Sequence, residues 1–149
     1  MYKIFSLFIF ILLLLSCADN EPEVVQPLTV TAFKIDDVDY LNSVRIMNIS
    51  QTPVFEITFS ASIKEEYLTS QHIDITGSGT KNYSLSSDKK TITITPSNTL
   101  PHISRLTFWV SHEIEGTKGE KLADQFSQYF YTTEDPTPKF PVVSDEELL

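Results

Sequence analysis

The chain has 149 residues, of which 20 are acidic and 11 are basic, giving a formal net charge of −9. This length fits one domain of ordinary size, and the acidic balance argues against sequence-independent nucleic-acid binding, which needs a basic face. A single cysteine excludes an internal disulfide and a zinc site built from several cysteines. The hydrophobic fraction of 41% is large enough to form a packed core.

Residues 1–16 have the layout of a secretory signal peptide. Lys3 gives a positive start, and residues 4–15 are apolar at all but one position, a run too short to span a bilayer as a helix. The small Ser16 then precedes Cys17, the only thiol of the chain. The segment resembles a bacterial lipoprotein box, which implies cleavage before Cys17 and its acylation with fatty acids such as palmitate. The alternative is an ordinary signal peptide followed by a chance cysteine.

Residues 17–27 follow as an acidic tether. Asp19, Glu21 and Glu23 lie in a stretch with almost no apolar side chain to bury, so we expect it to be extended. The acidic run after the cysteine resembles the surface-export signal of Bacteroidota lipoproteins. That resemblance implies a lipid-anchored protein of the outer membrane, exposed at the cell surface. A plain solvated linker is the alternative.

Residues 28–133 alternate between apolar and polar positions, as β-strands do. The clearest case is 54–60, where Phe55, Ile57 and Phe59 share one face. Turn-forming residues recur about every ten positions, which is typical of a sandwich. A short helical turn is expected within 63–71, and no segment has the long helical period of a βαβ unit. The expected strands are 28–35, 54–60, 72–76, 83–85, 91–95, 106–110 and 126–133.

Three short motifs stand out in this region. They are Thr-Ile-Thr-Ile-Thr-Pro at 91–96, Gly-x-x-Leu at 119–122 and Tyr-Thr-Thr at 131–133. Their order resembles that of a bacterial Ig-like domain of the S-layer type. The resemblance implies an all-β, Ig-like Greek-key β-sandwich of about seven strands that serves as a spacer or a binding module. The chain departs from the family pattern at 118–120, where Lys-Gly-Glu replaces Asp-x-x-Gly-Asn, and at 36–51, which is longer and less patterned.

Residues 134–149 form a proline-rich, acidic linker that ends as a helix begins. Ser144 and Glu147 have the spacing of a capping box, but the chain stops after two leucines, and one turn of helix is not stable alone. The tail resembles the opening of the glucoamylase-like glycoside-hydrolase domain of Bacteroidota lipoproteins, which implies such a domain downstream. The alternative is an ordinary acidic C-terminus.

No motif in the sequence predicts a catalytic or metal site. His72, His102 and His112 lack the spacing of a zinc motif, and the acidic run 36–39 lacks the pattern of an EF-hand. Ser-x-x-Lys at 86–89 has none of the companion motifs of a β-lactamase. We therefore expect no enzyme activity, no cofactor and no metal.

One set of aromatic side chains is the candidate ligand-binding surface. Trp109 falls on the face of its strand opposite Phe108 and its apolar neighbours. With Tyr129 and Tyr131 it forms an aromatic platform that can stack on sugar rings or pack on a neighbouring domain. The alternative is a central strand covered on both faces, with Trp109 in the core.

Together these patterns predict a non-catalytic spacer or interaction module of a membrane-anchored surface lipoprotein, linked to glycan utilisation. Its expected partners are the membrane, reached through the lipid on Cys17, and a downstream glycoside-hydrolase domain or a glycan, with no nucleic acid. The alternative is a stand-alone lipoprotein that binds a glycan or a protein.

Overall fold

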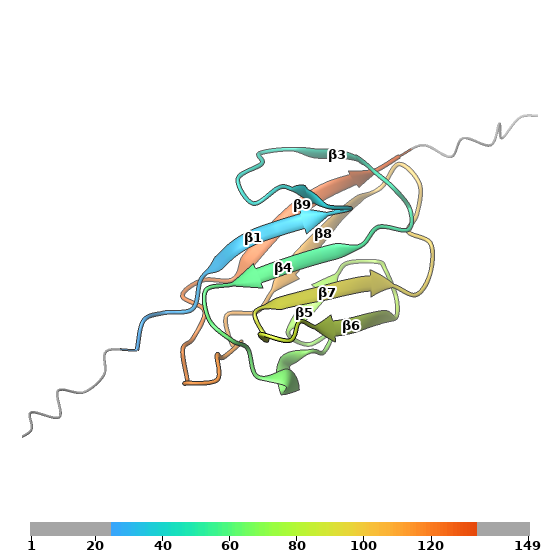
Figure 1. Ribbon diagram of the computed structural model, residues 1–149. Coiled ribbons are helices and arrows are strands. Elements are labelled where there is room, and N and C mark those ends of the chain that lie inside the picture. The colour runs from blue at the N-terminus through green and yellow to red at the C-terminus, as the bar shows by residue number, and fades with distance from the viewer. Residues whose placement is uncertain (1–24, 134–149) are drawn as a thin grey trace, which may run out of the picture.

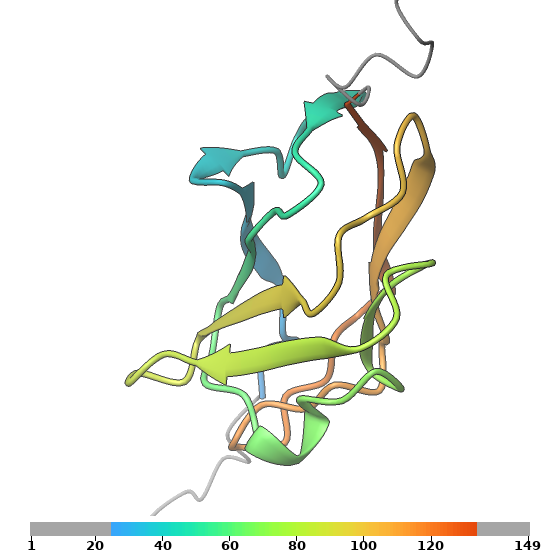
Figure 2. The same ribbon diagram turned by 90° about the vertical axis from the view of Figure 1, so that its right-hand side faces the viewer.

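The computed structural model describes residues 25–133, which form a two-layer β-sandwich (Figures 1 and 2). The predicted all-β, Ig-like class is confirmed, and the helical turn expected within 63–71 is a short 3-10 helix. Among the described residues, no helix is long and apolar enough to cross a membrane. The signal peptide, Cys17, most of the tether and the tail at 134–149 lie outside these residues. The elements are β1 Val30–Ile35, β2 Val38–Asp39, β3 Ile46–Ile49, β4 Phe55–Phe59, η1 Glu65–Tyr67, β5 Ile73–Ile75, β6 Lys81–Leu85, β7 Thr91–Pro96, β8 Arg105–Val110 and β9 Phe126–Thr132.

The strands are arranged in two sheets with the connectivity of an immunoglobulin domain. The β1 sheet has the order β2-β1-β4-β7-β6, and the β9 sheet has the order β3-β9-β8-β5. Without β2 and β3, the remaining seven strands have the order of a constant-type immunoglobulin domain. Both additional strands come from residues 36–51, the stretch in which the sequence shows no pattern. β2 extends the β1 sheet, whereas β3 pairs in parallel with β9.

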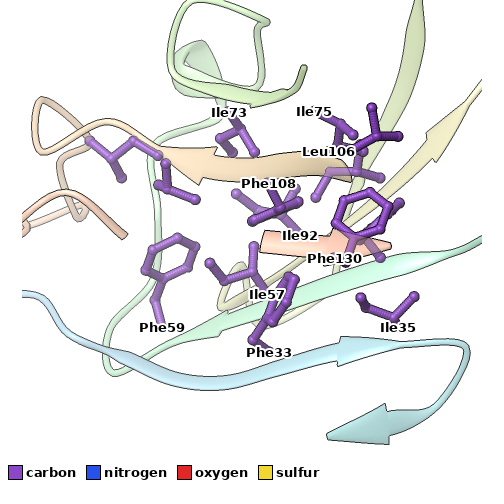
Figure 3. Packing of buried hydrophobic residues seen from close by; sticks show 14 of the residues in the cluster. Phe33, Ile35, Ile57, Phe59, Ile73, Ile75, Ile92, Leu106, Phe108 and Phe130 are labelled. Atoms are coloured by element: carbon purple, nitrogen blue, oxygen red, sulfur yellow. The ribbon is translucent and has the colours of Figure 1, made fainter. Parts of the chain in front are cut away.

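The core lies between the sheets and is centred on phenylalanine rings from both of them (Figure 3). Phe33 of β1 and Phe108 of β8 face each other with ring centroids 4.7 Å apart. Phe55 of β4 lies 5.6 Å from Phe108 and 5.3 Å from Phe130 of β9. These rings are buried because they occupy alternate positions of their strands, on the side that faces the other sheet. Isoleucines fill the space around them.

The two ends of the described chain lie at opposite ends of the sandwich. Figure 1 shows β1 beginning at one end, here called the N-terminal pole, and β9 ending at the other, the C-terminal pole. At the N-terminal pole the buried Leu28 donates its backbone N–H to the carbonyl of Lys121 at 2.9 Å. At the C-terminal pole the backbone N–H of Thr133 donates to Ile49, also at 2.9 Å. Each end is therefore fastened to the body of the domain.

The turn between β6 and β7 is organised by one carboxylate. The hydroxyl of Ser86 and the backbone N–H of Lys90 both donate to Oδ1 of Asp88, at 2.5 and 3.1 Å. These hydrogen bonds, that from Ser86 first, stabilise the charged form and lower the pKa of Asp88 from its ordinary value of 3.8. The ionised carboxylate thus holds the turn together.

Replacing Asp88 with asparagine is expected to lower stability at neutral pH and to have less effect in acid. The folded state depresses the pKa of Asp88, so its contribution is present above the unfolded pKa and is lost as pH falls through the folded pKa. Urea unfolding midpoints of the wild type and Asp88→Asn, measured at neutral pH and at about pH 3, should therefore converge at the lower pH. The same midpoint difference at both values would contradict this reading.

Candidate functional site

The outward faces of the two sheets differ in composition. On the β1 sheet the outward strand positions carry small polar side chains and a cross-strand charge cluster, in which Lys34 is in register with Glu56 of β4 and Asp39 of β2. On the β9 sheet the outward positions of β8 and β9 carry three aromatic residues, of which Tyr129 is exposed and the other two are half-buried. The small polar set is Thr58, Asn82, Ser84, Thr91, Thr93 and Thr95, and the set on β8 and β9 is Arg105, Thr107, Trp109, Ser127, Tyr129 and Tyr131.

The structure brings the three sequence-predicted aromatic residues together on this outward face of the β9 sheet. Trp109 is in register with the small Ser127, and the neighbouring outward residue of β9 is Tyr129. Tyr131 follows two positions later on the same face. Trp109 is half-buried, and Tyr129 keeps 52% of its surface exposed. Trp109 therefore lies outside the core.

Two arginines that belong to no sequence motif accompany these aromatic rings. The guanidinium of Arg105 lies over the ring of Tyr129, 4.2 Å from its centroid. Arg45 immediately precedes β3, whose Ile46 is in register with Phe130, so it lies beside the Tyr129 position of β9. Its Nε donates to the sulfur of Met47 at 3.2 Å. No sequence signal could place Arg45 here, because β3 itself carries no recognisable strand pattern.

A second polar cluster joins the free edges of the two sheets. The ammonium group of Lys81 on β6 forms an ion pair with Asp74 on β5 and donates to the carbonyl of Gly79 at 2.6 Å. The side chain of Lys81 is only 5% exposed, whereas that of Asp74 is 26% exposed. Nearby, the hydroxyl of Tyr83 donates to the carbonyl of Ile73 at 2.9 Å. This cluster links β5 to β6 across the gap between the sheets.

Tyr83 is expected to ionise at a pH well above the ordinary pKa of a tyrosine. Burial raises its pKa from 10.0 to about 12, and the negative charge of Asp74 adds to the effect. Because folding favours the neutral phenol, its contribution to stability is present below pH 10.0 and is lost as pH rises toward 12. An ultraviolet titration of phenolate should contain one late step that is missing in Tyr83→Phe. The same curve for both proteins would contradict this assignment.

An open cavity of about 460 Å³ lies at the N-terminal pole, beside η1. There His72 lies 3.9 Å from a carboxylate oxygen of Glu113, and its Nδ1 contacts the hydroxyl of Thr69 at 2.9 Å. Glu115 has two lysine partners, at 2.6 and 3.3 Å, whose hydrogen bonds lower its pKa. Within residues 25–133, no three His, Cys, Asp or Glu side chains are grouped so that they could hold a metal ion. The cavity residues are Tyr67, His72, His112, Glu113, Glu115 and Lys121.

The other polar residues considered from the sequence serve local structure. The carboxylate of Asp36 accepts hydrogen bonds from the backbone N–H of Val54 at 2.9 Å and from the hydroxyl of Ser50 at 3.3 Å. Asp39 accepts from the backbone N–H of Leu41 at 3.0 Å. The Ser-x-x-Lys sequence at 86–89 is the turn between β6 and β7. His102 and His112 lie apart from this turn, in the loops that flank β8.

Comparisons with known proteins agree with the Ig-like architecture. A family model described as a bacterial Ig-like domain matches residues 27–133. A cryo-EM reconstruction of native E. coli α2-macroglobulin is 13% identical and covers 74% of this chain and 6% of that one, with a TM-score of 0.52. A crystal structure of the domains MG0-NIE-MG1 of the same protein is also 13% identical, with a TM-score of 0.51. The match covers 74% of this chain and 33% of that one.

The S-layer protein rSbsC(31-844) is also similar, at 19% identity and a TM-score of 0.48. The match covers 75% of this chain and 14% of that protein. This chain thus corresponds to a small part of each of these structures, and at such identities the likeness concerns the fold alone. No curated protein matches the sequence.

Proposed function

The chain belongs to the bacterial Ig-like domain family, typically non-catalytic surface modules, and from this premise we propose that its sandwich is a rigid spacer in a lipid-anchored surface protein. The observation that supports this role best is the separation of the two ends, with β1 beginning at one pole and β9 ending at the other (Figure 1). A strand the length of β9, at about 3.4 Å per residue, spans roughly 20 Å or more. The domain therefore adds length between whatever lies on its two sides.

The backbone contacts at both poles support a stiff connection. Thr132 donates its backbone N–H to Ser104 at 3.1 Å and its buried hydroxyl to the carbonyl of Pro101 at 2.6 Å. Leu28 is fully buried at the opposite pole. A force or a position imposed at one end is thus transmitted through the paired strands rather than absorbed by loose termini.

The anchoring part of the proposal comes from the sequence. Fatty acyl chains on Cys17 would hold the protein on the outer membrane, since each buried methylene contributes about 0.8 kcal/mol. The acidic tether would place the sandwich at the cell surface, and a downstream glycoside-hydrolase domain, following residues 134–149, would be the group held away from the membrane. This arrangement links the protein to glycan utilisation.

Capture of the protein from the membrane fraction of its host, followed by intact mass measurement, tests the proposal. A spacer in cis requires a mass well above the 16.9 kDa of this chain. A mass equal to residues 17–149 plus acyl chains would contradict the spacer role while supporting the anchor. Cys17→Ser should release the protein from membranes and end palmitate labelling, whereas Ser16→Gly, which keeps a small residue before the cysteine, should change neither.

A second candidate function, binding of a glycan or a protein, is favoured by the aromatic face. Trp109, Tyr129 and Tyr131 share one outward surface, whereas the outward strand positions of the β1 sheet carry no aromatic residue. Such rings provide area for stacking with little loss of conformational freedom. Loss of glycan retention by Trp109→Ala, with the fold preserved, would support this function.

A further inference from the structure

We propose that the outward side of the β9 sheet binds a carboxylate-bearing glycan, with Arg45 and Arg105 as its carboxylate ligands. This inference rests on the second candidate function and assigns its ligand class. This surface, the arginine face, consists of outward side chains from three adjacent strands. Its residues are Arg45 and Met47 at β3, Tyr129 and Tyr131 on β9, and Arg105 and Trp109 on β8.

The arginine face is positive although the protein is acidic. Arg45 and Arg105 are the only arginines of the chain, which carries a formal charge of −9. The one acidic residue at an outward strand position of this sheet is Asp74, and its carboxylate is already paired with Lys81. The positive charge of the face is therefore left for a ligand.

Arg105 is held in a geometry suited to a carboxylate. Its guanidinium stacks on Tyr129 at 4.2 Å, which limits its motion and leaves the planar fork of N–H donors available. Within the described residues, neither arginine forms an ion pair with an acidic side chain. Arginine recognises carboxylates through paired, charge-assisted hydrogen bonds, so an anionic ligand is the matching partner.

The aromatic row favours a sugar chain over a simple anion. Trp109 lies beside the small Ser127, and diagonal neighbours across antiparallel strands are about 7–8 Å apart, which places Tyr129 next along the row. Tyr131 continues the row toward the C-terminal pole. An extended chain of rings that each carry a carboxylate can stack on such a row while its charges meet the arginines.

The negative net charge of the protein works against unspecific binding of polyanions. A chain at −9 repels polyanions at long range, so unspecific electrostatic attraction does not bring a polyuronate to its surface. Binding must come from local contacts at the arginine face. It should weaken as salt rises, because screening acts on these exposed charges.

Trp109 provides a direct readout, because it is the only tryptophan of the chain. We would titrate the purified full-length chain with oligogalacturonate and with the same oligomer methyl-esterified, which keeps the rings and removes the charges. The expected result is a saturable change in tryptophan fluorescence with the acidic oligomer and at least about tenfold weaker binding of the ester, since charge-assisted hydrogen bonds are the strong ones.

Matched variants locate the site. Arg105→Gln and Arg45→Gln remove one charge each and should each weaken binding of the acidic oligomer about tenfold. Lys34→Gln removes one positive charge from the outward face of the opposite sheet and should leave the affinity unchanged. Thermal unfolding of each variant, followed by circular dichroism, checks that the fold is preserved.

The outcomes separate this inference from the function on which it rests. Equal binding of the ester and the acid, unaffected by the arginine variants, would overturn the assigned ligand class while supporting a neutral glycan platform. Binding of poly-glutamate as tight as that of oligogalacturonate would overturn the assignment to a sugar. No fluorescence change with any glycan would overturn both the ligand class and the glycan-binding function.

Discussion

Replacing Phe108 with alanine is expected to lower the free energy of unfolding by about 3–5 kcal/mol, the largest effect of any single core substitution considered. Phe108 is fully buried, and its ring contacts three others, those of Phe33, Phe55 and Phe126, at centroid distances of 4.7, 5.6 and 6.3 Å. The alanine leaves a cavity between rigid sheets that cannot close around it. Since domains of this size are stable by roughly 5–15 kcal/mol, the variant should be close to unfolding at 37 °C.

Urea unfolding followed by circular dichroism measures this effect. Phe108→Leu is the matched control, because it retains most of the buried volume, and volume-conserving substitutions usually cost less than about 1.5 kcal/mol. Tyr129→Ala, on the outward face of the neighbouring strand, should cost far less than Phe108→Ala. If the three variants shifted the midpoint equally, Phe108 could not be the centre of the core.

The strands that carry the core could be predicted because each alternates with period two. The buried side of β4 is predicted by the alternation of Phe55, Ile57 and Phe59. The same alternation places Trp109 on the outward side of β8. The pattern is visible in the local sequence because successive side chains of a strand point to opposite faces. The general architecture and the aromatic part of the candidate site follow from it.

β3 could not be predicted, because its buried residues do not alternate. Ile46 and Ile49 face inward three positions apart, and the register with β9 shifts between them. Asn48 has a φ of 60°, a left-handed conformation that breaks the pleat. A strand that keeps no period of two leaves no periodic signal, so the sequence predicts neither β3 nor the place of Arg45 on the arginine face.

The burial of Lys81 also escapes sequence reasoning. A lysine at the start of a strand is ordinarily solvated, and nothing nearby in the sequence marks it as buried. Its environment arises only when the chain crosses from β5 in one sheet to β6 in the other, which closes the edge of the sandwich over its ammonium group. Contacts created by such crossings are properties of topology rather than of local pattern.

Lys81→Met is therefore expected to lower the free energy of unfolding by about 2 kcal/mol. Removal of one partner from a fully buried ion pair costs about 3–5 kcal/mol, and the 26% exposure of Asp74 reduces this penalty because water can solvate the remaining carboxylate. The substitution also leaves the carbonyl of Gly79 and the hydroxyl of Ser78 without the ammonium donor. Methionine fills a similar volume, so the loss reports on the polar contacts.

A double-mutant cycle isolates the pair. The double variant Asp74→Asn with Lys81→Met should be less destabilising than the sum of the two single changes. Each single change leaves one charge without its partner, whereas the double variant removes both charges. Additive effects would show that the two charges do not stabilise the sheet edge together. Tyr83 gives an independent spectroscopic check, since Asp74 helps to raise its pKa, and Asp74→Asn should move the late phenolate step to lower pH. Lys90→Met, which removes a lysine from the nearby turn, should leave that step in place because burial and Asp74, not Lys90, raise the pKa.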